Sequence, residues 1–154
     1  MTDAPGPVHE DELDPDVGLD ALTAPHPAVL LSVIALGGAV GTLGRYELGL
    51  HWRTAGDYGW SWATFVANLT GAFLLGLLVS LVARHWPASH YLRPALGTGV
   101  LGGWTTFSTY EVETVLRLRH GHVGIAVAYV LLTLVLGLAL AAAGLAAGNL
   151  GRRR

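Results

Sequence analysis

Four apolar stretches, separated by short polar segments, follow one another along the chain. They cover residues 28–48, 61–82, 96–116 and 123–145. A helix needs about 20 apolar residues to cross the hydrocarbon core of a bilayer, and each stretch is long enough. We therefore predict an all-α, multi-pass membrane protein with four transmembrane helices.

The third stretch differs from the others because it carries a run of glycine, hydroxyl and acidic residues, GGWTTFSTYEVE, over residues 102–113. Hydrocarbon does not solvate free backbone groups, so such sequence is found at membrane depth where it packs in protein or lines a wet cavity. The pattern predicts a break in the third helix near Gly102 to Thr105, with carbonyl oxygens exposed to a small cation. It indicates a protein that moves or binds an ion.

Polar side chains recur at helical spacing on the second and fourth stretches. Thr64 and Asn68 share one face of the second, and Tyr129, Thr133 and Gly137 share one face of the fourth. The Asn68 amide has two N–H donors suited to a small anion, and the hydroxyls would extend a polar track. The structural alternative is that Asn68 joins two helices and that the hydroxyls bond to carbonyls one turn back.

Aromatic and charged residues add further candidates. Phe107 and Tyr110 have positive ring edges that can contact an anion without a formal charge, unless they serve only in packing. Arg45 and Glu113 are ionisable residues near span ends, and such residues are functional candidates. Arg45 would draw anions into a vestibule or reach lipid headgroups, and Glu113 would serve the ion path or pair with Arg117.

Composition supports the membrane assignment, since 52% of the residues are hydrophobic and 13% are charged. The mean hydropathy is +0.49. The net charge is −2, and seven of the eleven acidic residues precede the first span. We expect a disordered, acidic, proline-containing tail over residues 1–26, a channel domain over 27–149 and a basic end over 150–154. Without cysteine, a nucleophile–base pair, a phosphate loop or a zinc motif, neither an enzyme nor a nucleic-acid-binding protein is indicated.

Orientation and assembly follow from the arginines and glycines. Four spans place five of the nine arginines on the side of the N-terminus and four on the other side. Loop arginines normally set orientation, so this near tie favours insertion in both orientations. Glycines one turn apart let helix backbones meet and favour a dimer. The pairs are Gly37 with Gly41, Gly99 with Gly103, and Gly144 with Gly148.

Three segments resemble the Fluc (CrcB) family of fluoride channels. They read GGAVGTLGRY over residues 37–46, TFVANLTGAFLLG over 64–76 and GGWTTFSTY over 102–110. The resemblance implies an antiparallel, dual-topology homodimer in the cell membrane that exports fluoride passively, with a structural sodium ion at its centre. The chain departs from the family pattern at Tyr110, where a second phenylalanine is usual, and at Gly137, where a hydroxyl is common.

Matching motif positions carry specific roles onto this chain. The resemblance assigns sodium to backbone oxygens of Gly102 and Thr105. It assigns fluoride to a path lined by Asn68, Phe107, Tyr110, Ser108, Thr109, Thr64, Tyr129, Thr133 and Glu113, and Arg45 joins this set as a cation at the entrance. Fluoride is a small, strongly hydrated acceptor, so neutral donors that replace its water suit a conducting path.

The sequence leaves two other functions open. Small proton-coupled exporters of organic cations are also four-span, dual-topology dimers, but their chemistry needs a carboxylate at membrane depth. The first span has none before Glu47 at its end. A non-transporting assembly protein would use the polar residues only to hold helices together.

Overall fold

The computed structural model describes residues 25–52 and 58–150 of the 154-residue chain. The expected tail, the basic end and Arg53 lie wholly or largely outside the described residues. The described part is all-helical and consists of α2 (Pro27–His51), α3 (Trp62–His85), the π-helix η2 (Pro94–Leu101), α4 (Gly102–Trp104), α5 (Phe107–Arg119) and α6 (Val123–Asn149).

Three of the predicted spans are single long helices. The helices α2, α3 and α6 have 25, 24 and 27 residues, and each is apolar enough to cross a membrane. The first of them begins at Pro27, where the missing N–H costs nothing because the first turn has no intrahelical acceptor for it. These spans are confirmed, and each helix ends three or four residues after the predicted end.

The remaining predicted span, over residues 96–116, is broken as expected. Thr105 (φ −81°, ψ 158°) and Thr106 (φ −147°, ψ 124°) are extended and separate α4 from α5. Gly102 keeps helical angles (φ −64°, ψ −35°), and Gly103 lies inside α4. The break therefore falls on the two threonines, at the end of the predicted segment, and the glycines continue the helix.

The glycines serve close packing between helices of the same chain. A Cβ on Gly41 of α2 would collide with the carbonyl oxygen of Val100 in η2, and one on Gly144 of α6 with that of Phe73 in α3. Similar collisions would arise at Gly37, Gly99, Gly103 and Gly148. The expected close association of helices is real, but these pairs do not carry the inference of a dimer, because their partners lie within one chain.

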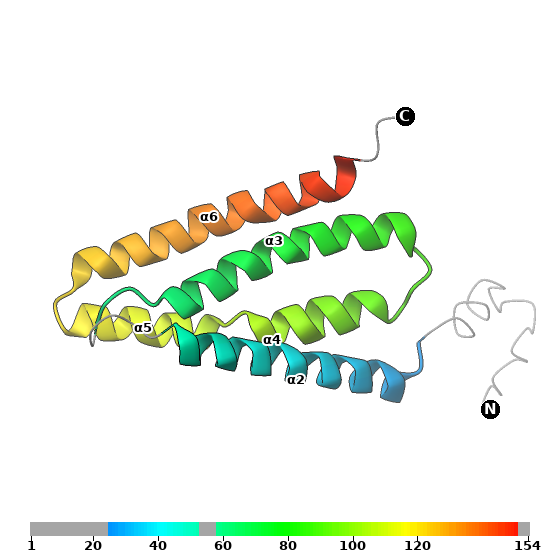
Figure 1. Cartoon of the computed structure of the whole chain (residues 1–154), viewed down its shortest axis with the longest axis horizontal. Helices are drawn as coiled ribbons and strands as arrows, with labels where there is room; N and C mark the ends of the chain where they lie inside the picture. The colour runs from blue at the N-terminus through cyan, green and yellow to red at the C-terminus, as the bar shows by residue number, and fades with distance from the viewer. Residues whose placement is uncertain (1–24, 53–57, 151–154) are drawn as a thin grey trace, which may run out of the picture.

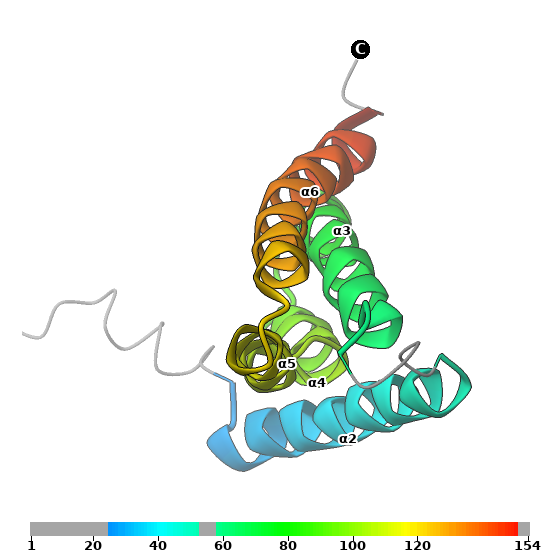
Figure 2. The same ribbon diagram turned by 90° about the vertical axis from the view of Figure 1, so that its left-hand side faces the viewer.

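The third span passes from one helix pair to another. The helix α6 runs along α3, whereas η2 and α4 run along α2 (Figures 1 and 2). Beyond the break, α5 packs against α6. The core is small, and its buried apolar residues all lie on α3 and α6; they are Phe65, Ala67, Val82, Ala126 and Tyr129. Large apolar side chains on the outside suit a bundle whose solvent is lipid.

Candidate ion-conducting site

Asn68 on α3 holds the break with two hydrogen bonds to one residue. Its Nδ2 donates to the carbonyl oxygen of Thr106 at 3.0 Å, and its Oδ1 accepts from the N–H of Thr106 at 2.8 Å. This side chain supplies partners that the interrupted helix cannot supply. The helix-joining alternative is thus realised, and the amide still has a second N–H that these bonds do not use.

These contacts release two backbone oxygens from their usual donors. In a continuous helix the N–H of Thr106 would donate to Gly102 and that of Thr109 to Thr105. Here the N–H of Thr106 donates to Asn68, and the N–H of Thr109 donates to the hydroxyl of Thr106 at 3.2 Å. The two oxygens expected to ligate a cation are the ones released.

A cluster of hydroxyls begins α5. The hydroxyl of Thr106 caps the helix by accepting from Thr109 N–H, and it donates to Thr109 Oγ1 at 3.0 Å. Ser108 Oγ lies 3.4 Å from the hydroxyl oxygen of Thr106. Ser108 and Thr109, both expected on the ion path, therefore adjoin the break.

Glu113 joins three helices through its two carboxylate oxygens. Oε1 accepts from Thr64 of α3 at 2.9 Å, and Oε2 accepts from the hydroxyl of Tyr129 of α6 at 2.9 Å. Tyr129 is fully buried. Three residues expected on the polar track are thus brought together, although they lie far apart in the sequence.

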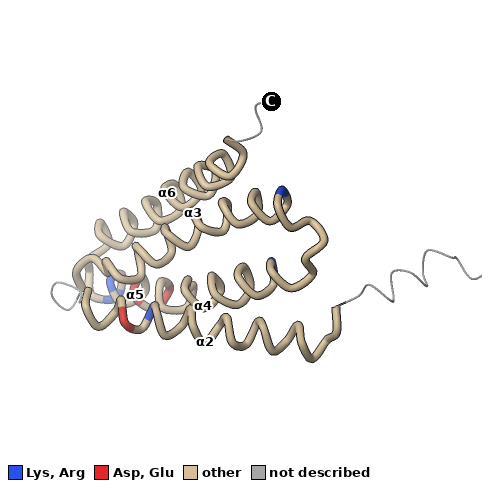
Figure 3. The backbone as a smooth tube through the Cα atoms, turned by 45° about the vertical axis from the view of Figure 1, so that its right-hand side comes forward, with Lys and Arg blue, Asp and Glu red and all other residues tan. Residues whose placement is uncertain are grey.

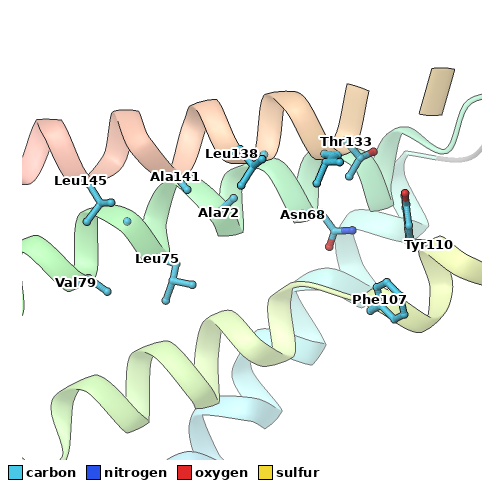
Figure 4. A pocket seen from close by; sticks show the side chains of 13 residues that line it. Asn68, Ala72, Leu75, Val79, Phe107, Tyr110, Thr133, Leu138, Ala141 and Leu145 are labelled. Carbon is cyan, nitrogen blue, oxygen red and sulfur yellow. The ribbon is translucent and has the colours of Figure 1, made fainter. Parts of the chain in front are cut away.

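A pocket of ≈ 620 Å³ opens between α3, α5 and α6, with Asn68, Phe107, Tyr110 and Thr133 in its wall (Figure 4). The ring centroids of Phe107 and Tyr110 are 6.1 Å apart, and Phe107 is 75% exposed. Thr133 has a buried hydroxyl oxygen that lacks a partner among the described residues. The fourth-span track therefore divides, since Thr133 and Gly137 line this pocket whereas Tyr129 bonds to Glu113.

Arg45 lies beside a second, more polar pocket of ≈ 470 Å³. Its Nε donates to the carbonyl oxygen of Gly103 at 3.1 Å. The polar residues around this pocket include Arg45, Ser61, Thr64, Thr106, Thr109 and Glu113. Arg45 thus borders a pocket and bonds to the third span, and its role at an ion entrance stays a prediction. In Figure 3 most of the red and blue segments gather around α5, whereas two blue segments lie at the opposite end of the bundle, where α3 ends and η2 begins.

Sequence reasoning missed the role of Arg117, which it treated only as an alternative partner for a glutamate. The side chain is 2% exposed, and its Nη2 donates to Gly59 O and Ser61 Oγ, both at 2.6 Å. Its Cζ lies 4.6 Å from the centre of the Tyr129 ring. The available signal was its position four residues after Glu113, which places both on one face of the helix.

The fold and the site define a small, multi-pass helical membrane protein whose third span is interrupted around buried polar contacts. The chain belongs to the family described as "CrcB-like protein, Camphor Resistance (CrcB)", whose profile matches residues 32–145.

Named relatives agree with this membership. A protein of Mycolicibacterium paratuberculosis named "Fluoride-specific ion channel FluC 1" is 45% identical over 69% of this chain and 80% of its own length. A protein of Agrobacterium fabrum named "Fluoride-specific ion channel FluC" is 42% identical over 77% of this chain and 94% of its own length. The protein of the same name from Bordetella avium is 43% identical over 76% and 90%.

Proposed function

We propose that this chain is a fluoride-selective channel, not an enzyme, that lets fluoride leave the cell down its electrochemical gradient. Its family and the names of its relatives support fluoride as the ion that passes through it. The observation that carries the proposal is the break at Thr105 and Thr106, held open by Asn68. It gathers an unused amide N–H, a hydroxyl cluster and two aromatic rings in one part of the membrane.

Neutral donors suit fluoride for a physical reason. The ion must lose water at each step, so the path has to replace its hydration with hydrogen bonds that are weak enough to release it. Hydroxyls such as those of Ser108 and Thr109, the amide of Asn68 and the ring edges of Phe107 and Tyr110 meet this need. A narrow path with donors spaced for a small ion disfavours chloride.

A sodium ion would be held by the backbone oxygens of Gly102 and Thr105. The support is that both oxygens are released from helical donors, and Na⁺ prefers oxygen ligands. When bound, the ion supplies positive charge that offsets repulsion between passing anions. We expect replacement of sodium by a large organic cation to lower the thermal unfolding midpoint of the purified protein; an unchanged midpoint would contradict the site.

The working unit is an antiparallel homodimer in this proposal. One chain leaves the ≈ 620 Å³ pocket open to the side, and Phe107 stands exposed at its edge. A second copy would close that face and enclose the path. The near-even distribution of arginines supports the opposed orientations.

The deciding experiment is ion efflux from proteoliposomes. Purified protein is reconstituted into vesicles loaded with potassium fluoride or potassium chloride, and anion release is followed after valinomycin is added. We expect rapid release of fluoride and negligible release of chloride. Equal release of both anions, or release of neither, would refute a fluoride-selective channel.

A further inference from the structure

Arg117 is a buried cation whose hydrogen-bond partners and ring contact among the described residues are neutral groups. Its Nε and Nη2 donate to Gly59 O, and Nη2 also donates to Ser61 Oγ. Its Nη1 is buried and has no hydrogen-bond partner among the described residues. A buried charge is costly unless an opposite charge compensates it, so this residue requires an explanation.

The nearest source of negative charge along the helix is Glu113, one turn before Arg117. Within the described residues the other acidic side chains are Glu47, at the end of α2, and the exposed Glu111. Glu113 and Arg117 contact the same buried side chain, Tyr129. The carboxylate accepts from its hydroxyl, and the guanidinium lies over its ring.

We propose that Arg117 compensates the charge of Glu113 across the Tyr129 ring and positions this tyrosine, an inference that rests on the proposed fluoride path. A direct ion pair between Arg117 and Glu113 would engage the oxygens that accept from Thr64 and Tyr129. The arrangement seen here leaves both oxygens to the hydroxyls, while the guanidinium over the ring of the same tyrosine offsets their charge.

This arrangement matters for an anion that uses the hydroxyls. Glu113 holds Thr64 and Tyr129 in place, but its own negative charge opposes fluoride near them. Arg117 reduces that repulsion without entering the path, and its bonds to Gly59 and Ser61 fix its position. A purely structural role would instead consist of anchoring the segment before α3.

Fluoride efflux separates the two roles. We expect Arg117→Met to slow efflux at least about tenfold, and Arg117→Lys, which keeps the charge and loses the planar fork, to stay within about threefold of wild type. Adding Glu113→Gln to Arg117→Met should restore efflux to the level of Glu113→Gln alone. The matched control is Arg119→Met, which removes an exposed arginine from the same helix and should change nothing.

The proposal is wrong if Arg117→Met conducts like wild type, if Arg117→Lys is as slow as Arg117→Met, or if Glu113→Gln fails to rescue. A second measurement does not depend on transport. We expect Arg117→Met to lower the thermal unfolding midpoint more in the wild-type background than in the Glu113→Gln background, because the charges are coupled. If wild-type protein carries no fluoride, the proposed function fails. The double-mutant cycle still decides whether Arg117 compensates Glu113. Additive shifts of the unfolding midpoint would refute that compensation.

Discussion

Asn68 combines a structural and a conducting role in one amide. The oxygen and one N–H fix the peptide of Thr106, and the second N–H is left for a ligand. The two readings of this residue from sequence are therefore compatible. A substitution that keeps its shape tests whether this residue lies on the path.

Asn68→Asp is that substitution. It keeps an oxygen for the N–H of Thr106, removes both N–H donors, including the one that bonds to Thr106 O, and places a carboxylate beside the proposed path. We expect fluoride efflux from proteoliposomes to fall at least about 100-fold because the new charge repels the anion. Asn149→Asp makes the same chemical change at the exposed end of α6 and serves as the control. Equal efflux in both variants would remove Asn68 from the path.

Tyr110 tests whether a ring edge or a hydroxyl serves the ion. If the edge is what matters, Tyr110→Phe should keep fluoride efflux within about threefold of wild type, whereas Tyr110→Leu should lose most of it. Fluoride efflux with a parallel chloride measurement checks both the rate and the selectivity. A large loss in Tyr110→Phe would show that the hydroxyl is required.

Residue patterns located most of the polar contacts but not Arg117. Helical spacing marked Thr64 and Tyr129, and Glu113 stood out as an ionisable residue near a span end. The structure brings the three within hydrogen-bond distance. Arg117 looked like an ordinary arginine at a span end, where such side chains usually reach water. Its burial depends on Gly59 and Ser61, which come from another part of the chain, and spacing along one helix cannot reveal such a contact.

At the scale of elements, the break in the third span was foreseen but placed too close to the glycines. Glycine permits a break without requiring one. The chain leaves the helix at Thr105 and Thr106 because Asn68 offers Thr106 better partners there. A local pattern cannot identify a partner on a different helix, so the position of the break depended on tertiary structure.

Gly144→Val tests the close packing of α6 on α3. The added side chain would collide with the carbonyl of Phe73 and the N–H of Leu77, and we expect a loss of about 1–3 kcal/mol in stability. Thermal unfolding in detergent measures the effect. Gly124→Val, near the start of α6, introduces the same residue where a Cβ meets nothing within 4 Å. Equal stability of the two variants would contradict tight packing at Gly144.

At the scale of the whole molecule, the sequence established the number and type of spans but not which glycines face which neighbour. Spacing marks a surface that allows close approach, and it does not say whether the partner is the same chain or another. The glycine pairs allow close packing between helices of the same chain. The proposed dimer thus depends on the open pocket, on exposed Phe107 and on the arginine distribution.

Dual topology can be tested directly because the chain has no cysteine. A single reporter, Ala88→Cys, lies exposed between α3 and η2. With insertion in both orientations, we expect about half of the chains in intact cells to react with a membrane-impermeant maleimide and the rest only after permeabilisation. Complete reaction, or none, before permeabilisation would show a single orientation.

The crossing of the third span from one helix pair to the other has a mechanical consequence. Its first half belongs with α2 and its second half with α6, and two extended residues are the joint between them. An ion whose binding changes the backbone geometry of these two residues therefore shifts both halves of the span and the helices packed against them. Spectroscopic labels on α2 and on α6 should therefore respond in concert when the ion is exchanged, although neither helix need touch it.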